Sequence, residues 1–270
     1  MSVTGEHGLE PLRGVELMRA QGRILMALIF RDIRTRFFGS AWGFLIVIAW
    51  PLTHILILLG IYLVMGRTAP YGDSIPLWFA TGIVPFICFS YMSRFITFGV
   101  VINRPLLSYP IVKITDIIFA RAVVELLNAM LVVIIVGVIF WSFGIDFMPN
   151  DPVEAGYALL ASMLLGLGFG AVGAIIAGII PIWAGFYGLV LVVMWVSCGV
   201  IFVPDALPMQ LQVPLSYFPL LQCVEWLRST YYEGYGSTIL DRGYVVGWGL
   251  STLFLGLALE RLLRGRILAG

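Results

Sequence analysis

The chain has 270 residues, of which 60% are hydrophobic and 11% are charged, and its formal net charge is only +1. Soluble domains carry about 25% charged residues. This composition, with a mean hydropathy of +1.00, therefore excludes an ordinary soluble domain and predicts an integral membrane protein. The balanced charge gives no support to nucleic-acid binding.

The first predicted element is a cytoplasmic arm over residues 1–40 that contains an amphipathic helix. Within 17–38, apolar side chains recur every four positions, at Leu25, Ile29, Ile33 and Phe37. Several arginines point to other faces, namely Arg23, Arg31 and Arg34. Such a helix is expected to lie on the membrane surface with its apolar face down, and a disordered basic tail is the alternative.

Six apolar stretches follow, and a membrane span needs about 20 residues. They cover approximately 41–65, 75–93, 117–143, two halves of 155–204, and 243–259. The uncharged stretch 155–204 breaks naturally at Pro181, because proline cannot continue the helical hydrogen-bond ladder. In the fourth span, Gly166 and Gly170 form a small-xxx-small pair, which predicts close packing within the bundle or, alternatively, a dimer face. The sequence therefore predicts an all-α integral membrane protein, with six transmembrane helices over 41–263 and a cytoplasmic tail over 264–270.

Basic residues concentrate in alternate loops. The arm and the C-terminal tail are rich in arginine, and the loop 101–116 holds Arg104 and Lys113, whereas the other connections hold mainly aspartate and glutamate. Because Lys and Arg mark the cytoplasmic side of short loops, we expect both termini in the cytoplasm. The outer segment 205–242 contains three prolines yet stays apolar. We expect re-entrant helices there, since irregular backbone at membrane depth must be covered by protein or line a cavity.

The sequence lacks the motifs of an enzyme. An ATP-binding loop needs a Gly-Lys pair, and the only lysine, Lys113, follows a valine. The two histidines cannot form a His-x-x-x-His metal pair, and the chain has no Gly-x-Ser-x-Gly elbow. We therefore expect no catalytic residue, no metal and no cofactor in this chain. His54 is the exceptional ionisable residue within a span, and local bonding in the bundle is favoured over a proton relay.

Aromatic residues on the first two spans form a candidate substrate path. They are Trp42, Trp50, Phe79, Phe86 and Phe89. On each span they fall within an arc of roughly 100°, at about 3.6 residues per turn. Rings stack on the apolar CH faces of sugars without strong, trapping contacts, which would suit a sugar chain. Packing in the core or against lipid is the simpler interpretation of any single ring.

Two arginines extend this candidate path. Arg94 follows the second span, and Arg121 lies near the start of the third. Arg121 and Glu125 have the i,i+4 spacing that favours a local ion pair at the membrane edge. The alternative is that Arg94 and Arg121 line an entrance for an anionic substrate.

The cytoplasmic loop 101–116 mixes apolar and basic residues on a short exposed segment. Its candidate docking residues are Arg104, Pro105, Leu106, Leu107, Tyr109 and Pro110. A membrane protein without its own motor could present them to a soluble partner. A loop whose side chains reach into lipid headgroups is an equal alternative.

Several short motifs occur in an order that resembles a known transporter family. They are Arg31-Asp32-Ile33-Arg34-Thr35-Arg36-Phe37, Gly39 with Gly43-Phe44, Gly82-Ile83-Val84-Pro85-Phe86, Tyr109-Pro110-Ile111-Val112-Lys113, Asp116 with Ala120-Arg121-Ala122, Pro219-Leu220, and Glu225-x-x-Arg228. From about residue 31 onward, the chain resembles the membrane subunit of type-2 ABC exporters, in particular the capsular polysaccharide export permeases. That family usually has asparagine before the proline and histidine three residues after it, whereas this chain has Phe218 and Gln222.

This resemblance implies partners and a substrate. Two copies of the chain would form a channel in the bacterial inner membrane. Two copies of a separate cytoplasmic ATPase, which binds ATP and Mg, would dock on the arm and the loop 101–116. The substrate would be a lipid-linked, often acidic, capsular polysaccharide moved outward, with periplasmic adaptor and outer-membrane proteins as further partners. An O-antigen or teichoic-acid exporter, a small-molecule or drug ABC permease, and a membrane assembly factor are the alternatives.

Overall fold

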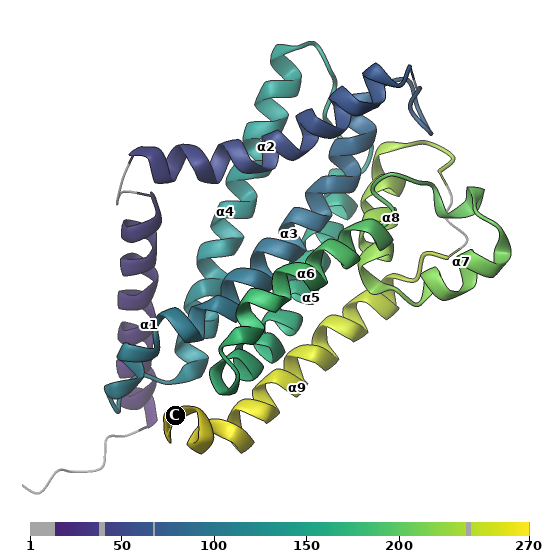
Figure 1. The fold of residues 1–270 in the computed structure, drawn as a ribbon. Coiled ribbons are helices and arrows are strands. Elements are labelled where there is room, and N and C mark those ends of the chain that lie inside the picture. Colours follow the sequence, from purple (N-terminus) through teal and green to yellow (C-terminus); the bar gives the residue numbers. More distant parts are fainter. Residues whose placement is uncertain (1–13, 38–40, 67, 236–238, 270) are drawn as a thin grey trace, which may run out of the picture.

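The computed structural model describes residues 14–37, 41–66, 68–235 and 239–269, and the regular structure of these residues is helical throughout (Figure 1). The long helices are α1 (Gly14–Phe37), α2 (Ala41–Val64), α3 (Ile75–Ile102), α4 (Ile114–Ser142), α5 (Pro152–Ile179), α6 (Ile182–Ser197) and α9 (Arg242–Ala269). The short helices are η1 (Arg104–Ser108), η2 (Pro204–Ala206), α7 (Met209–Ser216) and α8 (Pro219–Tyr231). The predicted all-α class is therefore confirmed for the described residues.

Four described helices, α3, α4, α5 and α9, are long and apolar enough to cross a membrane. Helix α6 and the Leu52–Tyr62 part of α2 are shorter apolar segments. The predicted break at Pro181 is confirmed, since α5 ends at Ile179 and α6 begins at Ile182. The count of six spans stays a prediction.

Local sequence explains where two of the spans start. Ser74 caps α3 by accepting a hydrogen bond from the Leu77 amide at 3.4 Å. Asp151 caps α5 by accepting from the amides of Val153 and Glu154 at 3.1 and 3.0 Å. Each helix also has a proline in its first two positions, where the missing N–H costs no helical bond.

Helix α9 is longer than the predicted sixth span. That prediction ended near residue 259 and left a separate tail over 264–270, whereas α9 continues to Ala269. Ile267 near its end is only 2% exposed, and a Cβ added at Gly178 of α5 would lie 3.1 Å from the Ile267 side chain. This packing on α5 stabilises the last turns of α9, which are too rich in arginine to resemble a span.

The core centres on α5, which packs extensively against both α3 and α9. Small residues make the close approach possible. A Cβ added at Gly166 would lie 2.6 Å from the Phe89 carbonyl oxygen of α3, and one at Gly168 would lie 2.8 Å from the Gly249 carbonyl oxygen of α9. The predicted close packing at Gly166 and Gly170 is confirmed, and it lies within the bundle.

Helix α1 packs by its apolar face against α4. The buried cluster that joins them consists of Leu28, Ile29, Ala120 and Val124. Leu25 and Ile33 pack against the same cluster, so these members of the four-residue repeat face protein and not the membrane surface, while the side chain of Phe37 lies outside the described residues. Met26 and Phe30 stay exposed on another side of the helix.

The segment between α6 and α9 folds into η2, α7 and α8. Helix α8 is almost entirely buried and packs against α3 and α5. None of the residues of α7 is buried. Short helices thus occur within 205–242, and their depth in the membrane stays a prediction.

Candidate functional site

A groove of about 330 Å³ lies between α2, α3 and α6. Its lining residues are His54, Ile83, Phe86, Ile87, Ser90, Tyr91, Arg94, Gly188, Leu191, Val192 and Trp195. Most of this wall is apolar, and rings from two helices, Phe86 and Trp195, contribute to it. Such a surface makes many weak contacts and few strong polar ones.

The polar residues of the groove are few. Ser90 donates to the Ile87 carbonyl at 3.3 Å, so its hydroxyl bonds within its own helix. The exposed Arg94 has its guanidinium carbon 5.9 Å from the centre of the Phe98 ring. Tyr91 packs edge-on against Phe95, with ring centres 5.9 Å apart.

A second cavity, of about 420 Å³, lies beside the C-terminal half of α3. It is lined by Arg31, Asp32, Thr35, Phe95, Phe98, Ile102, Asn103 and Arg121. The α3 residues of both cavities recur at steps of three or four positions, which places them on one face of the helix. Arg94 in the groove and Phe98 in the second cavity are in contact, so the two cavities follow each other along α3.

Asp32 of the arm organises the charges of the second cavity. Its carboxylate is 2.6 Å from the Arg31 guanidinium and 3.0 Å from that of Arg121. Arg31 also donates to the Asn103 side chain at 2.6 Å. Two arginines and one aspartate leave a net charge of +1 among these groups.

Arg121 thus has a partner that its spacing did not indicate. The sequence favoured a local pair with Glu125, and the structure shows an ion pair with an acid of α1, because α1 crosses α4 at this point. The roles of Asp32 and Asn103 were missed. In the sequence, the only signal for the role of Asp32 is that it stands among arginines. Its burial depends on the crossing of α1 and α4.

The structure separates the other predicted path residues. Phe86 lines the groove, but Phe79 and Phe89 are buried in the core. The Phe79 ring packs edge-on against Tyr62 at 4.5 Å, and the Phe89 ring packs against Phe169 at 5.6 Å. The side chains of the other two, Trp42 and Trp50, lie outside the described residues.

The predicted docking residues form the 3-10 helix η1 and the turn after it. Leu106 packs against the α1–α4 cluster, and Leu107 packs against the buried cluster shared by α3, α4, α5 and α9. Arg104 donates to the Ile267 carbonyl of α9 at 3.5 Å. The exposed members are Pro105, Tyr109 and Pro110. One side of η1 is therefore fixed to the bundle, while the other is available for contact.

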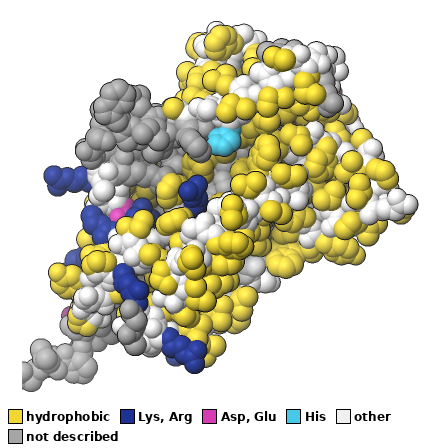
Figure 2. Space-filling view, in the orientation of Figure 1, with side chains coloured by type: hydrophobic (Ala, Val, Ile, Leu, Met, Phe, Trp, Pro, Cys, Tyr) yellow, Lys and Arg dark blue, Asp and Glu magenta, His cyan; other side chains and the backbone are white. Residues whose placement is uncertain are grey.

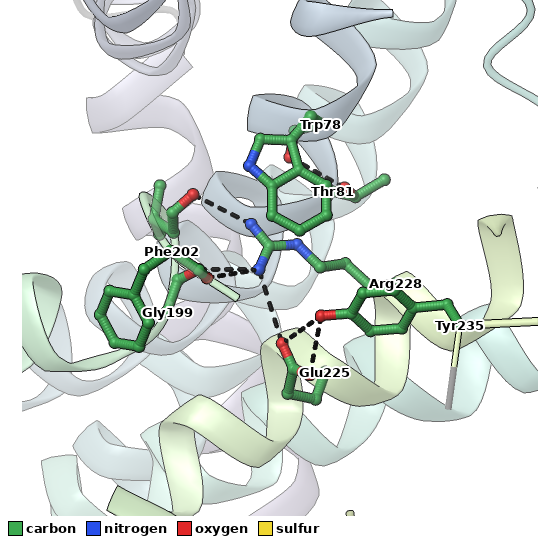
Figure 3. A network of polar contacts seen from close by, with 8 residues as sticks. Trp78, Thr81, Gly199, Phe202, Glu225, Arg228 and Tyr235 are labelled. Atoms are coloured by element: carbon green, nitrogen blue, oxygen red, sulfur yellow. Dashed lines mark hydrogen bonds and ion pairs between the residues drawn. The ribbon is translucent and has the colours of Figure 1, made fainter. Parts of the chain in front are cut away.

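A buried polar cluster lies at the opposite end of α3 (Figure 3). The Arg228 guanidinium is fully buried and stacks on the Trp78 ring, with its carbon 3.5 Å from the ring centre. It donates to three backbone carbonyls just after α6, those of Gly199, Val200 and Phe202, at 2.7, 2.9 and 3.3 Å. Glu225 lies 3.5 Å from the same guanidinium, so the charge of Arg228 is both paired and hydrogen-bonded.

Tyr235 completes this cluster. Its hydroxyl lies 2.9 and 2.8 Å from the two carboxylate oxygens of Glu225. Burial and the neighbouring Glu225 carboxylate raise the pKa of Tyr235, so the hydroxyl stays protonated and donates. Sequence inspection noted the Glu225-x-x-Arg228 spacing but not its partners, because carbonyl acceptors carry no sequence signal.

Named relatives are similar to this chain over most of their length. The polysialic acid transport protein KpsM of Escherichia coli is 32% identical over 236 residues, which cover 87% of this chain and 91% of that protein. The capsule polysaccharide export inner-membrane protein CtrC of Neisseria meningitidis is 26% identical over 247 residues, 90% of this chain and 92% of that protein. The corresponding protein BexB of Haemophilus influenzae is 26% identical over 247 residues, 89% and 91% of the two chains. No protein-family profile matches the chain.

Proposed function

The chain belongs to the capsule polysaccharide export family of inner-membrane ABC type-2 permeases, and on this basis we propose that it forms the channel of an ATP-driven exporter of lipid-linked capsular polysaccharide. The observation that best supports this proposal is the pair of cavities along one face of α3. A long polymer must slide, and a groove of rings and aliphatic side chains offers it contacts that are individually weak.

The charges of this path favour an acidic glycan. Arg94 stands in the groove, and Arg31 and Arg121 stand in the second cavity. Asp32 is the acid of the second cavity, and it is already paired with both of those arginines. A path with positive lining raises the local concentration of an anionic chain.

The proposed orientation places the η1 end of the bundle in the cytoplasm. Figure 2 shows basic side chains gathered on the side where α1, η1 and the end of α9 lie, while most of the remaining visible surface is hydrophobic. Lys and Arg mark the cytoplasmic side of membrane proteins. In this orientation α2 and α6 complete six spans, and α7 and α8 lie at the outer face as the re-entrant segment.

The proposed assembly has two copies of this chain and two copies of a cytoplasmic ATPase that binds ATP and Mg. Helix α6 supports the pairing of two copies of this chain, because it exposes an apolar stripe. The stripe consists of Ile182, Phe186, Leu189, Val193 and Val196. The exposed residues beside η1, such as Tyr109, support binding of the ATPase. Periplasmic adaptor and outer-membrane proteins would continue the export route.

Export of surface capsule by Phe86 and Arg94 variants tests the proposed path. In cells that lack the native subunit, Phe86→Leu should lower export while Phe86→Tyr keeps it, because a stacked ring is worth roughly 1–3 kcal/mol on a nucleobase and no more on a sugar. Arg94→Gln should lower export of an acidic glycan as well. The controls are Phe254→Leu and Arg261→Gln, which change exposed residues of α9. If the groove variants export as well as these controls at equal protein levels, the groove is not the path.

Binding of the ATPase should depend on Tyr109. This side chain is 61% exposed beside η1, and an exposed aromatic anchor at an interface is typically worth about 2 kcal/mol, or roughly 30-fold in Kd. We expect Tyr109→Ala to weaken binding of the purified ATPase to the subunit in lipid nanodiscs by about that factor. Tyr157→Ala changes a similarly exposed tyrosine of α5 and serves as the control. Equal affinities of the two variants would move the docking surface elsewhere.

A further inference from the structure

The backbone turn after α6 is held by side chains of other helices. All four carbonyl oxygens of residues 199–202 accept such a bond. Arg228 of α8 binds three of them, and the Tyr62 hydroxyl of α2 binds the fourth, that of Ile201, at 3.3 Å. A guanidinium at this position also complements the negative end of the α6 dipole.

Three helices that line the groove meet at this turn. Helix α6 ends in it, α2 contributes Tyr62, and α3 contributes Trp78 and Gly82 (Figure 3 shows the Trp78 ring against the guanidinium). A Cβ added at Gly82 would lie 2.8 Å from Nη2 of Arg228 and 3.1 Å from Cα of Val200. The absence of a side chain at Gly82 therefore permits the contact. Arg228 sets the spacing of the three groove walls at this end.

The opposite end of α6 is held by apolar packing. Ile182, its first residue, is 80% exposed. Two of the three buried residues of α6, Ala184 and Tyr187, lie in this half of the helix, and the third is Leu191. The break at Pro181 also separates this end from α5, so that it is not part of a continuous helix. The two ends of α6 therefore differ in the kind of contact that holds them, namely hydrogen bonds to a buried guanidinium at one end and apolar packing at the other.

We propose that Arg228 is a positioning residue for transport, which keeps the outer end of α6 fixed while the groove widens by movement of the opposite end. This inference rests on the proposed function of the groove as the glycan path. Moving the turn would leave a fully buried guanidinium without its acceptors, which is among the costliest changes in a protein interior. Moving the Ile182 end shifts apolar contacts, such as those of Ala184 and Trp183, and strands no buried charge among the described residues.

Two variants remove the anchor in different ways. Arg228→Lys keeps the charge, but a single ammonium group cannot reach three carbonyls and stack flat on Trp78. Gly82→Ala leaves Arg228 in place and displaces its guanidinium. Gly60→Ala on α2 is the matched control, since nothing lies within 4 Å of a Cβ there.

The readout is the amount of polysaccharide moved per ATP hydrolysed by the purified complex with its ATPase in vesicles, at equal amounts of folded complex. We expect both variants to keep ATP turnover and to lose about tenfold in export per ATP, which corresponds to roughly 1.4 kcal/mol. The control should match the native protein. If Arg228 acts only in folding, the yield of complex falls while export per ATP is unchanged, and the proposal is wrong.

Distances between labels test the fixed end directly and require no substrate. In a background with alanine at Cys88, Cys198 and Cys223, one label pair at positions 73 and 201 reports on the outer end of α6. A second pair at positions 102 and 186 reports on the opposite end. ATP binding to the complex should change the second distance and leave the first unchanged in the native protein, and should change both in Gly82→Ala.

The fixed end of α6 and the proposed export function can fail separately, and the measurements distinguish the two cases. Equal movement of both label pairs in the native complex would overturn the fixed end, whatever is transported. A native complex that moves no polysaccharide would overturn the proposed function instead, while the distances still report on Arg228.

Discussion

Gly166→Ala is expected to remove much of the folded protein from the membrane, although it adds a single methyl group. The added Cβ would lie 2.6 Å from the Phe89 carbonyl oxygen and 2.9 Å from the Met92 Cβ. The Phe89 oxygen belongs to the backbone of α3, so it cannot rotate away, and the two helices must separate. Overpacking of this kind typically costs about 1–3 kcal/mol and occasionally more. Total stabilities of domains are only about 5–15 kcal/mol.

The matched control is Gly156→Ala in the same helix. Nothing lies within 4 Å of a Cβ at Gly156, and alanine is a better helix former than glycine by about 1 kcal/mol. This variant should be as stable as the native protein or slightly more stable. The measurement is the yield of monodisperse protein after extraction and its thermal unfolding midpoint. Equal midpoints for the two variants would show that α5 and α3 do not approach as closely as described.

Asp32→Asn is expected to release the arm from the bundle and to abolish most export. The Asp32 side chain is 5% exposed and pairs with Arg121, which is 15% exposed, and with Arg31, which is 37% exposed. Removing one partner of a fully buried ion pair costs about 3–5 kcal/mol. The loss of stability in Asp32→Asn should be smaller than this, because Arg31 is partly exposed and water screens its charge.

A second substitution separates the charge from the packing. Arg121→Gln in the Asp32→Asn background removes the stranded cation, so the double variant should recover part of the stability lost by the single one. Asp73→Asn, at an exposed position, is the control. Thermal midpoints of the purified variants and surface capsule in cells are the measurements. A double variant that loses as much as the sum of the two single variants would exclude direct coupling between Asp32 and Arg121.

Several features could be predicted because they depend on composition and local chemistry. Long uncharged stretches predicted a membrane protein, and α3, α4 and α5 lie where three of those stretches were placed. Pro181 marked the break between α5 and α6, since proline removes a backbone hydrogen-bond donor, although Pro85 is accommodated inside α3. The pair Gly166 and Gly170 indicated a close helix contact, because small residues are what such contacts require.

Only the tertiary structure decided which face of each helix meets which neighbour. In these helices both the core side and the lipid side are apolar, so hydrophobic periodicity cannot tell them apart. Phe86 and Phe89 are three residues apart, yet one lines the groove and the other is buried in the core. Asp32 reaches Arg121, and Arg228 reaches the turn after α6, only because helices distant in sequence cross at those points. Such contacts depend on crossing geometry and on backbone acceptors, which have no signature in the order of the side chains.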